Sequence, residues 1–382
     1  MSCHINTTDA KTLIAIDQHA RSSVLYALNK QTGEVRKKRF TDCPSPENFT
    51  TWLDSWAQEP YYFAYESGPC GFYLARYLIK LGHMCDVIAV SSIPRSVKDK
   101  VTKDDFVDAS CLLNAIKTNS SALSKVYIPS TEAEDARDLA RQYQTISEDL
   151  RREKQRSNSF LLRHGDVYNE KTKTGRQKKL WGTDHKRWLE ALKFKTPKEQ
   201  EIFSTYYQKI LNLEMELNDC KDTIKTFAQN SKFKTYIEAL CAIKGVGLIT
   251  AFTFCATVDD FDRFKSGKAL ASYLGLVPRR HNSGEKNSSG RITKCGDKTL
   301  RRCLIEAFGA VSRFSPYTTD AILQTLPSAV RAEIENANNR IIRRRNALKE
   351  NGKNHNVIKV ALAKEAACQM LFVAKAVDLS NS

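Results

Sequence analysis

Short apolar runs rich in β-branched residues recur along the first part of the chain, and their spacing restricts the possible folds more than any other feature. Two such runs, Thr12–Ile16 and Ser22–Leu28, are followed closely by a segment of alternating character, Glu34–Phe40, and a Thr32-Gly33 turn precedes this third segment. Runs of this length that are bounded by turn residues predict strands. We therefore expect the chain to begin with a three-stranded meander.

Helical and strand patterns alternate after the meander. We predict helices over Pro46–Trp56, Gly71–Leu81 and Lys103–Lys117, separated by strands over Tyr61–Tyr65 and Cys85–Val90. This element order is that of ribonuclease-H-like domains, which are α/β folds with a mixed sheet and helices on its faces. We assign such a domain to residues 1–130.

Residues 131–235 are predicted to form a basic helical arm. Its first helix carries apolar residues at spacings of four and three, from Leu139 to Leu150, among many arginines. A polar, lysine-rich stretch predicts a loop insertion near 166–197, and a heptad-like pattern resumes from Lys198. We expect the two helices to form an antiparallel coiled-coil hairpin. The apolar stripe fits either a core within one chain or a seam between subunits.

Residues 236–382 are predicted to form a mainly helical third domain. Its segment Ile243-Lys244-Gly245-Val246-Gly247 leads into an apolar helix and resembles the turn of a helix-hairpin-helix motif. Glycines let a backbone approach a phosphate, whose charge is met by amide groups at a helix N-terminus. Lys244, Gly245 and Gly247 are therefore candidate contacts to a nucleic-acid backbone. An ordinary turn between two helices fits these five residues equally well.

The surplus of positive charge indicates the kind of partner. Lysine and arginine number 60 against 43 acidic residues, a formal charge of +17, which favours nucleic acid over a neutral small molecule. A basic protein whose lysines only solvate its surface is the alternative. No apolar run approaches the roughly 20 residues that span a bilayer, and no signal-peptide core is present. The eleven scattered cysteines include no Cys-x-x-Cys pair, so we expect neither a disulfide framework nor a zinc site.

Four acidic residues are candidate metal ligands. Asp17 follows the first predicted strand and Glu66 follows a later strand, while Asp105 and Asp108 lie three apart on a predicted helix. Strand ends in mixed sheets are where ligands are gathered, and carboxylate oxygens suit Mg²⁺ or Mn²⁺. A pair of such ions can hold the attacking and leaving oxygens of a phosphodiester. Taken singly, each acid fits a helix cap or a solvated surface residue as well.

A serine lies within a basic, glycine-containing segment of the third domain. Ser283 stands between a basic pair and Gly284, and further cations follow along the chain. A serine hydroxyl is a poor nucleophile by itself, so it would need cations to stabilise the charge that develops on a phosphate. The residues that could supply this charge are Arg279, Arg280, Lys294, Arg301 and Arg302. From these residues alone, a Ser-Gly turn in a loop is the other interpretation.

With these motifs in view, the chain resembles the DEDD transposases of the insertion-sequence family numbered one hundred and ten, which are recombinases guided by a bridge RNA. The resemblance extends over nearly the whole chain. It is carried by Ile14-Ala15-Ile16-Asp17, Tyr65-Glu66-Ser67-Gly68, Asp105-Phe106-Val107-Asp108-Ala109, Phe160-Leu161-Leu162-Arg163-His164-Gly165, Gly275-Leu276-Val277-Pro278, Ser283-Gly284 and Ile292-Thr293-Lys294.

The resemblance implies a RuvC-like domain whose tetrad, Asp17, Glu66, Asp105 and Asp108, binds magnesium, and a serine, Ser283, that becomes covalently joined to DNA. It also implies a coiled-coil arm, dimers that assemble to a tetramer on double-stranded DNA at element ends and target, and a structured guide RNA. The expected location is the cytoplasm of a bacterium or archaeon, at the nucleoid. The chain departs from the family at Asn282, where many members have serine, and at Gln18-His19-Ala20-Arg21, where members often have a lysine.

The hypothesis from the sequence is magnesium-dependent strand exchange through a phosphoserine intermediate. One alternative is a metal-dependent junction-resolving nuclease that uses water and forms no covalent link. Another is a nucleic-acid-binding protein without catalytic activity, in which the acids are structural. The four acids fit both the recombinase and the junction-resolving nuclease, so the role of Ser283 distinguishes these two hypotheses.

Overall fold

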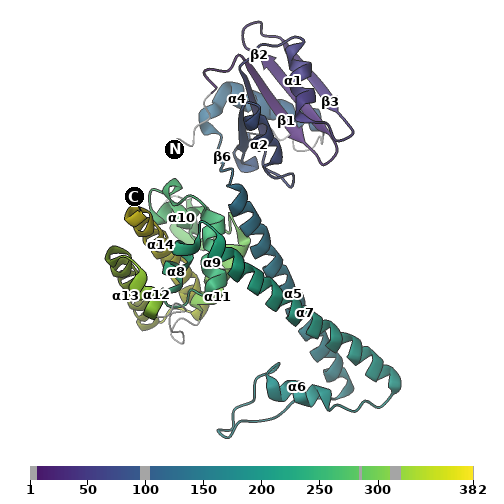
Figure 1. Cartoon of the computed structure of the whole chain (residues 1–382), viewed down its shortest axis with the longest axis vertical. Coiled ribbons are helices and arrows are strands. Elements are labelled where there is room, and N and C mark those ends of the chain that lie inside the picture. Colours follow the sequence, from purple (N-terminus) through teal and green to yellow (C-terminus); the bar gives the residue numbers. More distant parts are fainter. Residues whose placement is uncertain (1–6, 95–103, 284–285, 310–319, 382) are drawn as a thin grey trace. The chain divides into compact units, whose positions relative to one another are not determined.

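The computed structural model describes residues 7–94, 104–283, 286–309 and 320–381 (Figure 1). The chain forms two compact units, Met1–Pro129 and Ser130–Ser382. Within the described residues, no helix is both long and apolar enough to cross a membrane.

The first unit contains a six-stranded mixed sheet with the order β3-β2-β1-β4-β5-β6. The first three strands are an antiparallel meander, β4 and β5 run parallel to β1, and the short β6 is antiparallel to β5. The mixed α/β sheet predicted from the sequence is thus confirmed. The strands are β1 (Thr12–Gln18), β2 (Ser23–Asn29), β3 (Val35–Phe40), β4 (Tyr61–Glu66), β5 (Met84–Ile88) and β6 (Lys125–Val126).

Helices cover both faces of this sheet. On one face α1 (Pro46–Asp54) and α2 (Tyr73–Lys80) pack on Ile14 and Ile16, and on the other α4 (Asp105–Asn119) packs on Leu13 and Ala15. Because side chains alternate along a strand, β1 contributes to both cores. Two short 3₁₀ turns, Val90–Ser92 and Ser120–Ala122, complete the unit.

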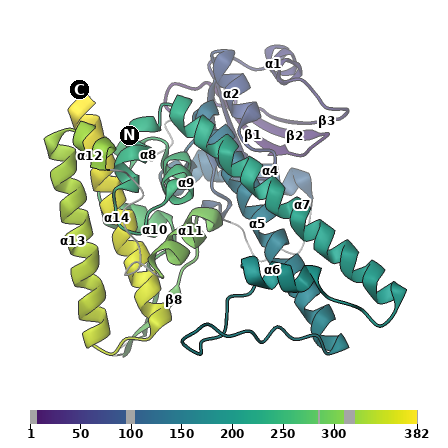
Figure 2. The same ribbon diagram turned by 60° about the horizontal axis from the view of Figure 1, so that its bottom comes forward.

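The second unit begins with two long helices that lie side by side, α5 (Thr131–His164) and α7 (Pro197–Asn230) (Figures 1 and 2). They are antiparallel, because Lys154 pairs with Glu214 at 2.6 Å and the backbone N–H of Lys232 donates to Glu132 at 3.1 Å. Ser130 and Thr196 cap their N-termini, each accepting a hydrogen bond from a backbone N–H three residues on. Apolar residues between the helices, including Ile210 and Ile224, are fully buried.

The stretch predicted as a loop insertion, 166–197, contains a helix, α6 (Thr183–Glu190), so the loop prediction was wrong there. The polar composition hid the helix because only His185 and Leu189 of its eight residues are buried. Leu189 packs with Phe160 and Phe203 of the two long helices in a small separate core. The helix therefore depends on tertiary packing more than on its own pattern.

The rest of the second unit is a helical body around α9 and α14. Every residue of α9 except Ile249 is buried, and α14 packs with α8, α10, α11 and α13. Its helices are α8 (Lys234–Cys241), α9 (Leu248–Val258), α10 (Gly267–Tyr273), α11 (Lys298–Phe308), α12 (Asp320–Thr325), α13 (Ser328–Glu350) and α14 (His355–Asn381), with a 3₁₀ turn at Phe261–Arg263. The mainly helical C-terminal region expected from the sequence is confirmed.

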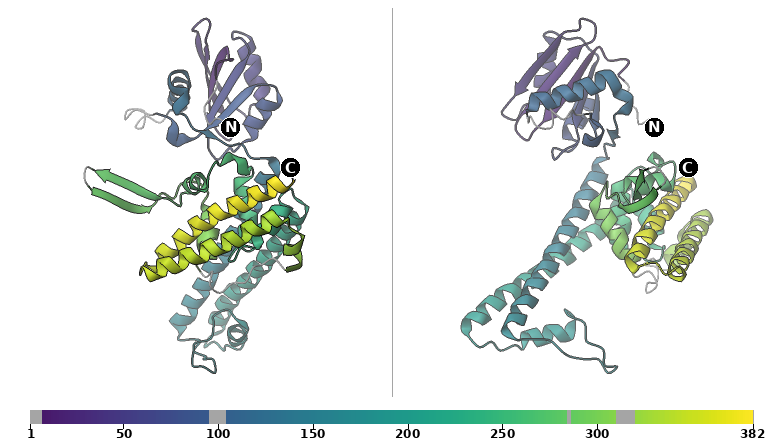
Figure 3. Two further views of the ribbon diagram at one scale, coloured as in Figure 1. Left: turned by 90° about the vertical axis from the view of Figure 1, so that its left-hand side faces the viewer. Right: turned by 180° about the vertical axis from the view of Figure 1, so that it is seen from behind.

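A two-stranded antiparallel ribbon extends from this helical body (Figure 3). It consists of β7 (Pro278–Ser283) and β8 (Lys286–Ile292), with Pro278 opposite Ile292 and Ser283 opposite Lys286. No strand was predicted in this region, where a Ser-Gly turn was one interpretation of Ser283-Gly284. Its sequence is mostly polar and lacks the apolar alternation that predicts a strand.

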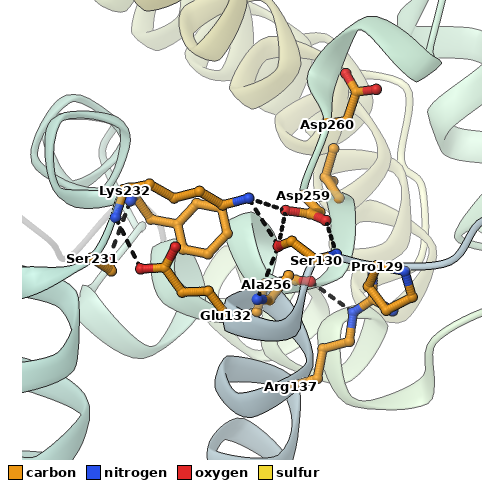
Figure 4. Close-up of polar contacts among 12 residues, drawn as sticks. Pro129, Ser130, Glu132, Arg137, Ser231, Lys232, Ala256, Asp259 and Asp260 are labelled. Carbon is orange, nitrogen blue, oxygen red and sulfur yellow. Dashed lines mark hydrogen bonds and ion pairs between the residues drawn. The ribbon is translucent and has the colours of Figure 1, made fainter. Parts of the chain in front are cut away.

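A buried carboxylate joins three elements of the second unit where α5 begins (Figure 4). Asp259, directly after α9, accepts hydrogen bonds from the Ser130 backbone N–H at 2.7 Å, the Ser130 hydroxyl at 3.0 Å and the Lys232 ammonium at 2.6 Å. Arg137 of α5 donates to the carbonyls of Ala256 and Thr257 at 2.7 and 2.9 Å, near the C-terminus of α9 where a cation is favourable.

Candidate metal centre

The strand register brings Asp17 and Glu66 together at one edge of the sheet. Strand β1 pairs with β4 in parallel, with Ile16 opposite Tyr65, so Asp17 and Glu66 are the next residues on neighbouring strands. Alternation places Asp17 on the face of Leu13 and Ala15, and the same period places Glu66 on the face of Tyr62 and Ala64. This is the face that α4 covers.

The other two acids stand in the first turn of α4. Asp105 and Asp108 are three residues apart, and the negative charges of both act on Asp17. The pKa of Asp17 is raised, chiefly by burial of the carboxylate; His19 opposes this shift, and the two acids of α4 add to it. Asp17, Asp105 and Asp108 therefore lie close enough to repel one another.

Asp17 and Glu66 also line a common cleft. It has a volume of about 880 Å³ and lies where β1 and β4 end, with Ser67, Cys70 and Tyr73 among the other lining residues. Its size is sufficient for part of a large ligand. The cleft gives these two carboxylates access from outside the fold.

Two basic side chains that were not selected from the sequence complete the site. His19 Nε2 lies 3.1 Å from Asp17 Oδ2 and 3.4 Å from Asp105 Oδ1, and Arg39 donates to Asp105 Oδ2 at 2.8 Å. The hydrogen bond from Arg39 is the main reason why the pKa of Asp105 is lowered. Arg39 is far from the acids in sequence, but Asp17 pairs with Val24 and Val24 pairs with Arg39, so one row across the meander joins them. Only the strand register shows that Arg39 lies beside the acids.

The chemistry of these side chains fits a divalent cation. Among the described residues, Asp17, His19 and Asp105 each offer a ligand atom within 4.8 Å of the others. Oxygen ligands suit Mg²⁺ or Mn²⁺, and a bound cation would offset the repulsion from Asp105 and Asp108, which adds to the effect of burial on the pKa of Asp17. In the arrangement seen here Arg39 supplies positive charge beside Asp105, and His19 Nε2 lies beside both Asp17 and Asp105.

The candidate helix-hairpin-helix residues lie in the turn between α8 and α9. Gly245 has a φ of 92°, which favours glycine, and Gly247 precedes the first residue of α9. The backbone N–H of Lys244 donates to the Asn338 side chain of α13 at 2.7 Å. The turn is therefore held to α13 through that amide, and it leads directly into the N-terminus of α9.

The basic residues around the candidate serine have different surroundings. Ser283 is the last residue of β7, but its side chain and that of Arg280 lie outside the described part of the structure, as does Gly284. Arg279 and Lys294 are exposed. These two are available to a partner in solution.

Arg301 and Arg302 make contacts within the protein instead. Arg301 is 9% exposed, and its Nη1 donates to the carbonyls of Leu274 and Cys295 at 3.1 and 2.7 Å. Arg302 of α11 pairs with Glu148 of α5 and with Glu306 at 2.7 Å. Arg301 thus holds the chain on both sides of the ribbon, and Arg302 joins two helices.

Comparison with known proteins finds two family models that match different parts of the chain. A model of DEDD transposases of IS110, described as "Transposase", matches residues 14–165. The model described as "Transposase IS116/IS110/IS902 family" matches residues 237–323. The first match includes all four acids, and the second includes Ser283.

Several curated proteins are similar to the chain. The protein y4qE of Sinorhizobium fredii, which is named as a transposase, is 33% identical over 320 residues, covering 83% of this chain and 76% of its own length. The transposase for insertion sequence element IS1533 of Leptospira borgpetersenii is 30% identical over 244 residues, covering 64% and 68%. The pilin gene-inverting protein of Moraxella lacunata is 38% identical over 86 residues, covering 20% and 26%.

Proposed function

This chain belongs to the IS116/IS110/IS902 family of transposases, and from that premise we propose that it cuts and rejoins double-stranded DNA at element ends and target. The observation that carries the proposal is the convergence of acids from β1 and α4, with a fourth acid at the neighbouring end of β4. The strand order and these positions support a ribonuclease-H-like, RuvC-like first domain over residues 1–130.

We propose Asp17, Glu66, Asp105 and Asp108 as the ligands of Mg²⁺, or of Mn²⁺. When bound, the cation would polarise the scissile phosphate and stabilise the oxygens that enter and leave. Asp17 is the half-buried ligand whose position the sheet determines, whereas Arg39 and His19 orient Asp105. Arg39 and His19 act as positioning residues.

Ser283 is the proposed nucleophile. Its hydroxyl oxygen attacks phosphorus and loses its proton, the bond from phosphorus to a deoxyribose oxygen breaks, and that oxygen leaves as a hydroxyl. Attack by the hydroxyl of a partner strand then forms the new phosphodiester and releases the serine. Arg279 and Lys294, both exposed, are suited to stabilise the charge on the phosphate, as is Arg280 by its place in the sequence. The similarity to a protein named for inverting a pilin gene supports rearrangement of DNA over simple cleavage.

We further propose that a structured guide RNA selects the DNA sites and that dimers assemble to a tetramer on DNA. The helical hairpin of α5 and α7, over residues 131–235, supports a coiled-coil arm for contacts between subunits. In residues 236–382, Lys244, Gly245 and Gly247 contact the phosphate backbone through a helix-hairpin-helix-like turn. Arg301 and Arg302 would act from within the fold, because Arg301 holds the chain on both sides of the ribbon that carries Ser283 and Arg302 joins α5 and α11.

The proposal is tested with element-end DNA, guide RNA and Mg²⁺ by trapping covalent protein–DNA adducts after denaturation. The wild type and a Ser288→Ala control should give adducts, whereas Ser283→Ala should give none while it retains DNA binding. Adducts that persist in Ser283→Ala would rule out this serine.

A second pair of variants tests the metal centre. Asp17→Asn should lose strand cleavage with DNA binding retained, and the exposed Asp9→Asn should cleave as the wild type does. Full activity of Asp17→Asn would contradict the metal assignment. Metal-dependent cleavage without any adduct in the wild type would favour a junction-resolving nuclease. The four acids belong to the first unit and Ser283 to the second, so the acids could cleave DNA with water as the nucleophile.

A further inference from the structure

A large groove lies in the second unit between the base of the β7–β8 ribbon and the helix pair α13 and α14. Its volume is about 1280 Å³, and its walls include Pro278 and Ile292 of the ribbon and Ile305 of α11. The two helices lie side by side along it (Figure 2). This volume exceeds the roughly 300–1,000 Å³ of most small-ligand pockets, so the groove suits an extended ligand.

The rim of the groove is strongly basic. Six cationic side chains line it, from the ribbon, the loop after it and both helices: Arg291, Lys294, Arg340, Arg343, Arg344 and Lys364. The one acidic lining residue, Glu365, accepts from Arg340 at 3.0 Å. For the other five cations, the described residues include no acid in an ion pair with them. Such an excess favours an anionic partner with several charges.

The floor of the groove is aliphatic. Leu276, Ile292 and Val360 are among its side chains, and Val357 is 53% exposed at the start of α14. Apolar surface next to a row of cations matches a strand whose phosphates face the rim and whose bases cover the floor. In a duplex, the faces of the bases are stacked inside and cannot reach such a floor, so the fit is to unpaired nucleotides.

DNA fits this floor better than RNA does. Among the described lining residues, Asn356 is the sole side chain with an uncharged polar group. The 2′-hydroxyl of a ribose that lies on the aliphatic part of the floor would lose water without gaining a hydrogen bond from the aliphatic side chains there, whereas deoxyribose carries no such group.

We propose that this groove binds an unpaired DNA strand, with the phosphates held by the arginines of α13 and the bases resting on the aliphatic floor. This proposal depends on one part of the proposed function, namely that the chain acts on DNA. The groove adjoins the ribbon whose β7 ends at Ser283, so a strand held there would be retained while the duplex is opened for exchange.

The test measures binding of the full-length protein to fluorescent oligonucleotides by anisotropy over a series of salt concentrations. The probes are a single-stranded DNA, the same strand in a duplex, and the RNA of the same sequence. The double variant Arg343→Ala/Arg344→Ala removes two exposed groove cations. Its matched control, Arg331→Ala/Lys349→Ala, removes two exposed cations from the same helix outside the groove.

The groove variant should bind single-stranded DNA roughly ten-fold more weakly, and the slope of log K against log salt should fall by about 1.4, since each phosphate contact on a single strand contributes about 0.7. The control should keep the wild-type slope. Val357→Ser should weaken binding of single-stranded DNA a few-fold and leave duplex binding unchanged. These readouts need no strand exchange, so an inactive Ser283 or metal centre would not affect them.

Four results would overturn the proposal. The first is wild-type affinity and slope in the groove variant. The second is an equal loss on duplex and single strand, which would make the groove a general backbone surface. The third is an equal or larger loss on RNA, which would identify RNA as the occupant. Displacement of the DNA by polyglutamate at equal charge concentration would likewise show that the floor contributes nothing.

Discussion

The carboxylate of Asp259 offers the sharpest test of how the second unit is held together. Its side chain is 1% exposed and accepts hydrogen bonds from the Ser130 backbone, the Ser130 hydroxyl and Lys232. The substitution Asp259→Asn keeps the shape and one acceptor oxygen, so the side chain at this position of φ 62° hardly changes in size. It therefore removes the charge and one acceptor with little change to the backbone.

The expected cost follows from these contacts. The amide group replaces one of two acceptor oxygens, so either the Ser130 N–H or its hydroxyl loses its partner, which costs about 1–3 kcal/mol for a buried group. Loss of the ion pair adds less than about 1 kcal/mol, because Lys232 is 45% exposed and its charge regains water. We expect the free energy of unfolding to fall by about 2 kcal/mol.

The pH dependence has a definite sign. Although burial raises the pKa of Asp259, the hydrogen bonds from Lys232 and Ser130 outweigh it, and the pKa lies below its ordinary value of 3.8. A carboxyl whose pKa is lowered by folding contributes stability that is present above 3.8 and is lost as the pH falls through the folded-state pKa. The difference between the wild type and Asp259→Asn should therefore be constant near neutral pH and shrink below about pH 4.

Urea unfolding followed by circular dichroism at 222 nm measures the difference, because helices of the second unit dominate that signal. The control is Asp262→Asn, whose side chain is 82% exposed and pairs with Lys375 at 3.2 Å, and it should change stability by less than about 0.5 kcal/mol. A midpoint for Asp259→Asn equal to that of the control would refute the argument. A difference that persists undiminished at pH 3 would refute the assignment of the charge.

Three other substitutions test the packing around the candidate sites. Gly296→Ala should destabilise the second unit by more than about 2 kcal/mol in urea unfolding, because a Cβ there would lie 2.0 Å from the Tyr273 carbonyl oxygen at a φ of 69°; a neutral effect would contradict the close approach. Arg301→Met should cost about 2–3 kcal/mol by leaving buried carbonyls without a donor, and a variant of wild-type stability that binds DNA poorly would instead show that Arg301 contacts DNA. Glu214→Gln should speed amide hydrogen exchange in α6, since Glu214 accepts from Lys186 at 2.6 Å, and unchanged exchange would show that the apolar core alone holds this helix.

Patterns that are local in sequence predicted much of the fold. Strands β1 to β5 and helices α1, α2 and α4 lie within a few residues of the segments expected from apolar periodicity. The two long helices were recognisable for the same reason, since an apolar stripe that repeats at helical spacing over many turns is typical of a long packed helix. Elements whose stability comes from distant contacts gave no such signal. Helix α6 depends on Phe160 and Phe203, and the sequence of the β7–β8 ribbon lacks the apolar alternation of a strand.

The candidate site divides in the same way. From the sequence alone, the types of the four acids and their places at strand ends and in a helical turn were sufficient to predict a metal site, because strand period and helix period are properties of the chain itself. Only the tertiary structure revealed that Arg39 and His19 contact Asp105, that Arg301 is buried, and that arginines of α13 line a groove beside the ribbon. Contacts of this kind depend on strand register and helix packing between residues far apart in the chain, and local patterns carry no information about them.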